Sequence, residues 1–569
     1  MRQPGEMRKR EHAMNAKNIT RQHFVAGTAL GTAAAALGVA AAPTLAPRPA
    51  IADEAADSDW ASVLNVDIAS VLPGNTSEQV EVVDTKDCDV LVIGAGVSGA
   101  NTAIRAGELG KKVILVEKTD TIGGASNLSS GPIGYNSRIA LDAGEQTDIL
   151  PLLNDWIAGS HYRVDAASVK QLLEKSGEAI DWMSDNGWEF TPWFSASMVK
   201  FPDYSVREQL FLDALDRTVV ANGGEVLTGT CAKRLVVDDE GKVTGAVVVD
   251  VEGKGLQINA AATVIATGGY GGNLDMVERV FRFRGVLGGL PQNVGEGLEM
   301  AWRAGAQKPQ NFGGQMLHQT LARANDPLAE QFDAFPAKYP MILCYVAKLM
   351  NVGATGARFR NEENALSAVA AANTSAYQGS FHYVVVSKGI MDTLEQEGLA
   401  GLGIEKSPGL PPRYKPEFEL DTPWENITGV FDAMVEAGAG YKGDTPEELA
   451  LAAGMDVDIF TRQFEAYESY CAEGVDEQLG KAADNLIAYG EGPYYIVIAE
   501  ENNLGSWGGL LTNADFEALD WNRLPVKGLY AVGNEAGSCL FNDTYVGSGI
   551  ALGNAVTSGY LCGTKLGEK

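Results

Sequence analysis

The chain has 569 residues, a formal net charge of −30, 66 glycines and 22 prolines. This length exceeds what one compact core accommodates and favours two domains. The excess of glycine over proline favours the many tight strand-to-helix turns of an α/β protein. The negative charge argues against a nucleic-acid partner, because binding to phosphates requires clustered lysine and arginine.

The cysteines give no sign of a disulfide framework or a metal site. No pair has the Cys-x-x-Cys spacing of zinc, haem or ferredoxin-like sites. We therefore predict no metal. An iron–sulfur cluster held by cysteines from distant positions has no support in this spacing but stays open. The six stand singly, at Cys88, Cys231, Cys344, Cys471, Cys539 and Cys562.

The first 52 residues have the pattern of an export signal. A basic start precedes an apolar run rich in alanine and glycine at 24–42, and Ala50-Ile51-Ala52 is a small-residue cleavage site. We predict a signal peptide over 1–52 and a polar linker over 53–85. The protein is then expected in the cell envelope, in the periplasm or on the outer face of the membrane.

The export route is less clear than the export signal. The stretch that begins Thr20-Arg21-Gln22 is similar to a twin-arginine leader, with Gln22 in place of the second arginine. This departure puts the twin-arginine route in doubt. An uncleaved membrane anchor and a start at Met14 are the alternatives.

A nucleotide-binding unit begins after Asp87. A continuous apolar strand over 88–93 runs into Gly94-Ala95-Gly96-Val97-Ser98-Gly99, and a helix is expected up to Leu109. A second strand over 113–116 ends in Glu117. Strand, glycine triplet, helix, strand and acidic residue in one run indicate a dinucleotide site of the Rossmann type.

Each part of this unit has a mechanical role. Gly94 permits the tight turn, Gly96 lets the backbone approach a pyrophosphate, and Gly99 allows the helix to pack closely on the strand. The helix N-terminus favours negative charge, and Glu117 can accept hydrogen bonds from ribose hydroxyls.

Three later segments indicate FAD rather than NAD. They are Thr121-Ile122-Gly123-Gly124-Ala125-Ser126, the strand and glycine stop at 263–269, and Gly528 to Glu535. In this order and separation they resemble the flavoprotein subunit family of fumarate reductases, succinate dehydrogenases and 3-ketosteroid dehydrogenases over 87–569.

The resemblance implies an α/β fold with a Rossmann-type FAD-binding domain in two parts, 86–317 and 504–569. An α+β capping domain is inserted over 318–503, and the active site lies between the two. The implied FAD contacts are Gly94, Gly96, Val97, Ser98, Gly99, Glu117, Lys118, Gly123, Gly124, Ala125, Ser126, Ala232, Thr267, Gly268, Gly269, Gly533, Asn534, Glu535, Gly549 and Ile550.

Motifs that are absent from this sequence indicate how the flavin is held and where its electrons come from. Family members with covalent flavin carry a histidine shortly after the Gly-Gly-x-Ser stretch, and 127–130 has none, so FAD is expected to be noncovalent. A second strand-plus-glycine-triplet unit and a Cys-x-x-Cys-His haem motif are also absent from the sequence. We expect electrons from a separate carrier, such as a membrane or multihaem cytochrome or a quinol-linked protein.

The dicarboxylate clamp of the fumarate reductases is mostly missing. His318 matches the first substrate-binding histidine of that branch, but Leu366 stands where its arginine acid belongs. The second histidine falls near Asn502-Asn503, and Tyr545 replaces the last carboxylate-binding arginine. Fumarate and succinate are therefore disfavoured substrates.

The replacements resemble the 3-ketosteroid dehydrogenase branch. In that branch a tyrosine hydroxyl and the N–H of a glycine four residues later bind a ketone oxygen, and Tyr545 and Gly549 have this spacing. Two neutral donors aimed at a carbonyl form an oxyanion hole. The alternative is that Tyr545 only packs over the flavin.

A reductase of this kind also needs a proton donor for carbon. The candidates are Tyr204, His318 and Glu362, with Tyr339 and Tyr345 as outsiders. A tyrosine near pKa 10 stays protonated at neutral pH and can donate. His318 could equally be a structural histidine.

The leading hypothesis is an exported FAD-dependent oxidoreductase acting on CH–CH bonds. It would reduce a C=C bond conjugated to a carbonyl in a bulky neutral small molecule, such as a steroid enone or the unsaturated lactone of a cardiac glycoside. The alternatives are a 3-ketosteroid dehydrogenase, a respiratory reductase of an unsaturated acid of the fumarate, cinnamate or acrylate type, and a non-catalytic flavin electron-transfer protein.

Overall fold

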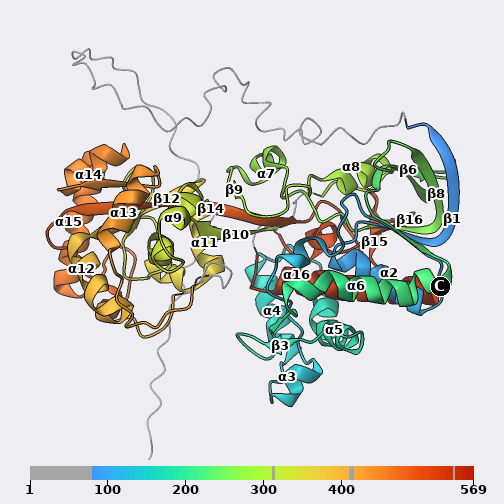
Figure 1. Ribbon diagram of the computed structural model, residues 1–569, viewed down its shortest axis with the longest axis horizontal. Coiled ribbons are helices and arrows are strands. Elements are labelled where there is room, and N and C mark those ends of the chain that lie inside the picture. The colour runs from blue at the N-terminus through green and yellow to red at the C-terminus, as the bar shows by residue number, and fades with distance from the viewer. Residues whose placement is uncertain (1–79, 310–313, 409, 411–415, 543–544) are drawn as a thin grey trace, which may run out of the picture. The chain divides into compact units, whose positions relative to one another are not determined.

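The computed structural model describes residues 80–309, 314–408, 410, 416–542 and 545–569 (Figure 1). The predicted leader over 1–52 and the predicted linker up to residue 79 lie outside these residues. None of the helices in the described ranges is both long enough and apolar enough to cross a membrane.

The first sheet has a parallel core in the order β16-β8-β1-β2-β5. The last four residues of β1 and all of β2 are buried and apolar, which is typical of parallel sheets covered by helices. An antiparallel strand, β15, extends one edge, and β7 and β6 extend antiparallel from β8. The bounds are β1 (Val82–Ile93), β2 (Val113–Val116), β5 (Glu225–Leu227), β6 (Cys231–Val237), β7 (Val243–Val249), β8 (Gly255–Ile265), β15 (Glu517–Leu519) and β16 (Pro525–Ala531).

Helices α2 (Val97–Glu108) and α16 (Ile550–Glu568) lie side by side against this sheet (Figure 1). The Thr102 hydroxyl donates across the contact to the Gly559 carbonyl, at 3.2 Å. The last helix of the chain therefore packs on the helix that follows the first glycine triplet. The other helices of this part are α3 (Arg138–Asp142), α4 (Ile149–Gly159), α5 (Ala166–Asp185), α6 (Tyr204–Thr218), α7 (Leu274–Phe281) and α8 (Glu296–Arg303).

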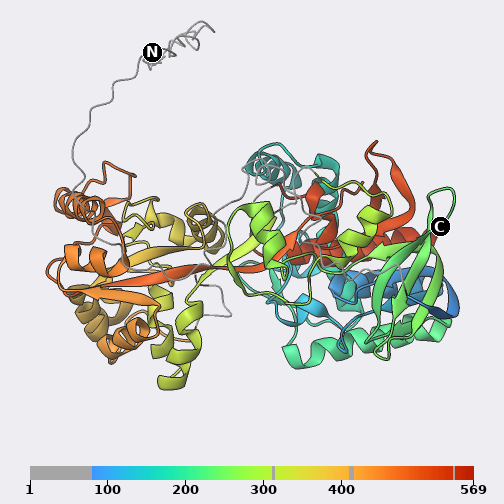
Figure 2. The ribbon, with the colours of Figure 1, turned by 90° about the horizontal axis from the view of Figure 1, so that it is seen from above.

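The second sheet is built around the long strand β14 (Tyr494–Trp507), which is visible in Figure 2. Its first half pairs antiparallel with β12 (Phe381–Ser387) and β13 (Gly440–Gly443). Its second half pairs with β10 (Gly314–Thr320) and, in parallel, with the two-residue β9 (Val286–Leu287). A further strand, β11 (Asn351–Val352), pairs with β12.

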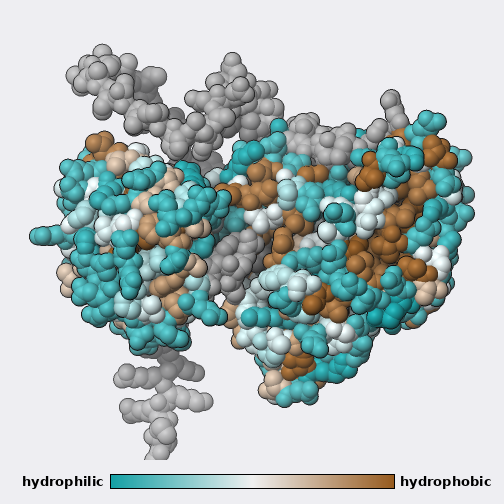
Figure 3. Space-filling model, in the orientation of Figure 1, coloured by the Kyte–Doolittle hydropathy of each residue, from teal (hydrophilic) through white to brown (hydrophobic). Residues whose placement is uncertain are grey.

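Helices on the second sheet enclose a core of their own. This core runs from Leu321 to Ala499 and is separate from the clusters around the first sheet. The helices are α9 (Ala322–Gln331), α10 (Tyr339–Leu343), α11 (Ala368–Ala376), α12 (Lys388–Glu397), α13 (Ile427–Glu436), α14 (Pro446–Ala453) and α15 (Val457–Glu473). On the face seen in Figure 3, hydrophilic residues cover most of the surface over these elements.

The predicted α/β class with a Rossmann-type parallel sheet and a second, mixed part is confirmed. The boundaries at 318 and 503 stay a prediction. The short strand β9 pairs with β14 although it belongs to the predicted first part of the FAD domain.

A buried ion cluster lies in the second part of the chain. Arg358 donates to both carboxylate oxygens of Glu362 and to Asp476, each at 2.7 Å, and Lys481 lies 3.3 Å from Glu362. All four side chains are fully buried. Burial opposes the charge on Asp476, but hydrogen bonds from Arg358 and two backbone N–H groups lower its pKa to about 2. Burial lowers the pKa of Lys481 to about 8.

The turn after β1 is closed by glycines in contact with one another. Gly94 has φ +102°, a conformation that disfavours any side chain. A Cβ on Gly99 would lie 1.9 Å from the Gly94 carbonyl oxygen, which belongs to the backbone and cannot move aside. This contact sets how closely α2 approaches the end of β1.

Gly99→Ala should therefore lower the free energy of unfolding by about 3 kcal/mol or more, since the added methyl group overlaps backbone. The matched control is Gly159→Ala at the exposed end of α4, where an added Cβ meets nothing within 4 Å. That change should be neutral or slightly stabilising. Chemical denaturation followed by circular dichroism measures both, and equal effects would contradict the proposed contact.

Glu362→Gln should lower the free energy of unfolding by about 3 kcal/mol, because Arg358 and Lys481 would stay buried with one carboxylate fewer. Asp392→Asn removes a partly exposed partner of Lys388 on α12 and should cost about 0.5 kcal/mol or less. The same denaturation experiment compares them. A Glu362→Gln protein as stable as Asp392→Asn would show that the cluster contributes little.

Candidate functional site

A cavity of about 900 Å³ opens at the carboxyl ends of β1, β2 and β8. Ligands of open α/β sheets bind at this edge. Residues from most of the predicted cofactor motifs line the cavity, and so do His318 and Tyr545. The predicted FAD contacts on its wall are Gly94, Gly96, Val97, Ser98, Glu117, Lys118, Gly124, Ala125, Ser126, Ala232, Thr267, Gly268, Asn534 and Gly549.

The N-terminus of α2 faces this cavity. Gly96 is the N-cap residue and provides no capping side chain, so the first amides of the helix have no side-chain partner there. A Cβ on Gly96 would find its first neighbour only at 4.0 Å, which leaves open space beside the backbone. Open amides at a helix N-terminus fit the pyrophosphate of a dinucleotide.

Glu117 stands at the end of β2 as the fingerprint predicts. One carboxylate oxygen accepts from the Ala95 N–H at 2.9 Å, and the other accepts from the Thr119 N–H and hydroxyl, each at 2.9 Å. These contacts fix the carboxylate on the cavity wall. The geometry fits the acceptor that the ribose hydroxyls of FAD need.

Several predicted contacts lie behind the wall and brace it. Gly123 donates to the Ala95 carbonyl at 2.8 Å, and Glu535 accepts from the Thr267 hydroxyl and the Gly269 N–H. Burial raises the pKa of Glu535. The cavity lining does not include Gly99, Gly123, Gly269, Gly533, Glu535 and Ile550.

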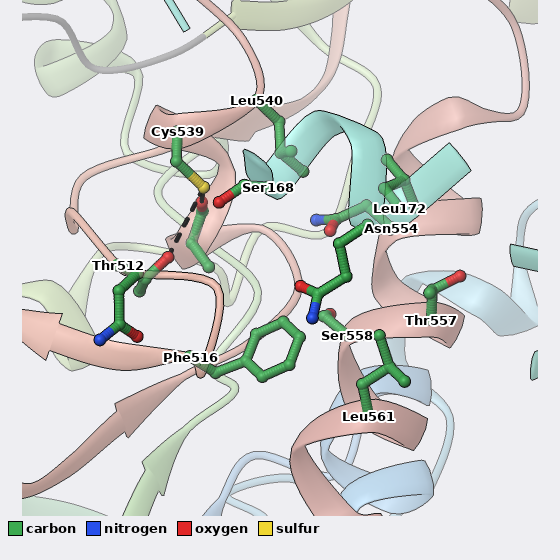
Figure 4. A pocket seen from close by; sticks show the side chains of 13 residues that line it. Ser168, Leu172, Thr512, Phe516, Cys539, Leu540, Asn554, Thr557, Ser558 and Leu561 are labelled. Carbon is green, nitrogen blue, oxygen red and sulfur yellow. Dashed lines mark hydrogen bonds between the residues drawn. The ribbon is translucent and has the colours of Figure 1, made fainter. Parts of the chain in front are cut away.

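The loop at Gly533 is fixed by the last helix. Asn554 donates to the Gly533 carbonyl and Ser558 accepts from the Gly533 N–H, both at 3.0 Å. Figure 4 shows Asn554 and Ser558 together on α16, beside a second cavity of about 20 Å³. That cavity holds no more than a water molecule, so it serves no cofactor or substrate.

Tyr545 lies on the wall of the large cavity. Its ring stacks on Trp507 at 4.7 Å and 15°, and its hydroxyl accepts from the Ala551 N–H in the first turn of α16 at 3.1 Å. Burial raises the pKa of Tyr545, so the hydroxyl keeps its proton at neutral pH. Gly549, the N-cap of α16, lies on the same wall.

The candidate proton donors differ in whether they line the cavity. His318 is buried and lines the cavity. Tyr204 is half exposed, packs over the Arg207 guanidinium and is not part of the lining. Glu362 belongs to the buried ion cluster of the second part, away from the lining.

The two outsiders are core residues. Tyr339 stacks on Trp424 at 4.4 Å, and the Tyr345 hydroxyl donates to the Gln319 carbonyl at 2.9 Å. Neither lines the cavity. Of the five candidates, the structure therefore brings only His318 to the cavity wall.

The lining carries little positive charge. Among the described residues of the wall there is no arginine, and its lysine, Lys118, pairs with Glu296. Leu366, at the position of the family's arginine acid, is also part of the wall. Within the described ranges, no three His, Cys, Asp or Glu side chains are grouped to hold a metal ion.

The sequence motifs missed part of this wall. Trp193, Phe194 and Met198 line the cavity, and so do Gly288, Gly289 and Leu290. These residues stand in no recognisable motif, and only the fold brings them to the site. Tyr204 lies close to Trp193 in sequence but does not reach the wall.

Comparisons with known proteins agree with this geometry. Vinyl phenol reductase of Lactiplantibacillus plantarum is 28% identical over 490 residues, which cover 83% of this chain and 94% of that protein. Urocanate reductase of Eggerthella lenta is 25% identical over 492 residues, covering 83% of this chain and 75% of that protein.

A solved structure shares the fold. It is 3-ketosteroid delta1-dehydrogenase from Sterolibacterium denitrificans in complex with 1,4-androstadiene-3,17-dione, with a TM-score of 0.62 and 18% identity. The match covers 85% of this chain and 100% of that one.

The family model described as FAD binding domain matches residues 89–552. This range includes the glycine triplet, the Glu117 strand end, the Gly533 loop and the Tyr545 segment. The predicted cofactor and the predicted resemblance are thereby confirmed, and the enzyme class with them. The chain belongs to the FAD-binding-domain family and is an FAD-dependent oxidoreductase.

Proposed function

We propose that the protein reduces a C=C bond conjugated to a carbonyl in a bulky, uncharged molecule. The observation that carries this proposal is the absence of arginine among the described residues of the cavity wall. A carboxylate brought against this described wall would lose its hydration without gaining an arginine partner, which costs several kcal/mol. A neutral carbonyl compound avoids that cost.

Tyr545 and Gly549 are the proposed carbonyl-binding residues. FAD, when bound, supplies the hydride chemistry. The Tyr545 hydroxyl accepts from Ala551 and so keeps its own proton free to donate to the carbonyl oxygen. The neighbouring helix N-terminus stabilises the negative charge that this oxygen gains.

His318 is the proposed proton donor to carbon. It is the only one of the five candidate donors on the described cavity wall, and it lies on β10 opposite Asn502 of β14. The histidine imidazole is the most common general acid in enzymes. Tyr545 then donates a hydrogen bond to the carbonyl oxygen, and His318 donates the proton to carbon.

A second candidate is reduction of the vinyl group of a phenol. The match to vinyl phenol reductase covers 94% of the length of that protein, at 28% identity. A phenol is uncharged at neutral pH and suits the same wall, with its oxygen in place of the ketone oxygen. The unsaturated acids suit this wall less well.

Export and the electron source remain part of the proposal. The basic and apolar leader over 1–52 supports a location in the cell envelope. A separate cytochrome or quinol-linked carrier is the proposed donor, because the sequence contains neither a haem motif nor a second nucleotide fingerprint.

The test is anaerobic. The holoenzyme is reduced with dithionite or reduced viologen, and flavin reoxidation is followed with a steroid enone, a cardenolide, 4-vinylphenol and fumarate. We expect the neutral compounds to reoxidise the flavin and fumarate to leave it reduced. Faster reoxidation by fumarate would contradict the proposal, and bleaching of the oxidised flavin by a saturated 3-ketosteroid would favour the dehydrogenase alternative.

Tyr545→Phe should lower kcat about 100-fold while FAD stays bound, because one oxyanion-hole donor is lost. Tyr345→Phe is the control, since it removes a buried hydroxyl that donates to a backbone carbonyl outside the cavity. Turnover measured with each protein's FAD content gives the comparison. If Tyr545→Phe turns over as fast as Tyr345→Phe, the carbonyl-binding role is wrong.

A further inference from the structure

Two aromatic side chains form part of the cavity wall without belonging to any cofactor motif. Trp193 and Phe194 stack on each other at 4.5 Å and 24°, in the loop between β3 (Thr191–Pro192) and β4 (Val199–Lys200). Both line the large cavity, and Phe194 is 68% exposed. An aromatic pair left open to solvent beside a cavity is a typical ligand contact.

The loop that carries this pair is held firmly. The Glu145 carboxylate accepts from the Ala196 N–H at 2.7 Å and from the Ser197 N–H at 3.1 Å. The Trp193 N–H donates to the Met198 carbonyl at 2.9 Å, which closes the loop. Phe194 is therefore exposed on a fixed backbone, and little ordering is needed when a ligand binds.

The same loop touches the carbonyl-binding end of the cavity. Met198 is bridged to Ile133, and a Cβ on Gly549 would meet the Met198 methyl carbon at 3.2 Å and the Ile133 nitrogen at 3.3 Å. The aromatic pair and the proposed oxyanion hole thus share one wall. A substrate whose carbonyl lies at Gly549 could extend its remaining part toward Phe194.

We propose that Trp193 and Phe194 are specificity-determining residues that bind a planar or ring-bearing part of the substrate. The pair offers aromatic faces, with the Lys200 ammonium 5.7 Å from the Trp193 ring centroid, so it favours a flat group over a small aliphatic one. This inference rests on the proposed function, because it takes the carbonyl end of the substrate to lie at Tyr545 and Gly549.

Two enones with the same methyl ketone test the role of the pair. Benzylideneacetone carries a phenyl ring on the double bond, and 3-penten-2-one carries a methyl group. Phe194→Leu should raise KM for benzylideneacetone about tenfold and leave kcat for this substrate within about twofold of the wild-type value. For 3-penten-2-one, both KM and kcat should stay within about twofold of the wild-type values. Trp521→Leu is the control, because Trp521 is 69% exposed and lies outside the cavity lining.

A binding measurement accompanies the kinetics. The saturated ketone 4-phenyl-2-butanone is titrated into the oxidised holoenzymes while the flavin absorbance is followed. We expect weaker binding to Phe194→Leu by about tenfold and unchanged binding to Trp521→Leu.

The outcomes separate the two proposals. If neither these enones nor the steroid enone and the cardenolide reoxidise the reduced wild-type flavin, the proposed function fails, and the titration still decides whether Phe194 binds the ring. A different result overturns only the inference on the aromatic pair. In that case the wild-type protein reduces both enones, while Phe194→Leu keeps the wild-type ratio of kcat/KM between them and binds 4-phenyl-2-butanone as tightly as the wild-type protein does.

Discussion

The contact between Gly94 and Gly99 is the constraint on which the site depends. It lets α2 start directly at the end of β1, so that the open amides at Gly96 face the cavity. The Glu117 carboxylate and the Gly533 loop then take their places around that helix end, the latter through Asn554 and Ser558 of α16. A larger residue at Gly99 would move the helix away from the strand and widen the whole arrangement.

The described cavity wall lacks arginine, and two arginines of the second part of the chain are held by other partners. Arg358 is bound by two buried carboxylates, and Arg360 donates to the Asn351 side chain and the Ala371 carbonyl. Both arginines of Arg358-Phe359-Arg360 thus have partners within the second part of the chain. On the described wall, neutral donors and aromatic rings take the place of a carboxylate clamp, and this change directs the proposed chemistry from dicarboxylates toward neutral carbonyl compounds.

The cofactor half of the site could be predicted from the sequence because its determinants are local. A strand, three glycines, a helix start and an acidic strand end must follow one another in the chain, and the spacing of Tyr545 and Gly549 is equally short. The donor role considered for Glu362 could not be tested in this way, since Lys481, which pairs with Glu362, and Asp476, which shares Arg358 with it, come from distant positions. The place of the Trp193–Phe194 pair could not be predicted from the sequence either, because only the fold brings that loop to Gly549.

The central claim is that the site selects uncharged substrates. The most direct measurement compares methyl cinnamate with cinnamate in anaerobic reoxidation of the reduced holoenzyme, because the two share ring and double bond and differ in charge. We expect the ester to react at least about tenfold faster, which corresponds to about 1.4 kcal/mol. Equal rates, or a faster reaction with the acid, would contradict a neutral site.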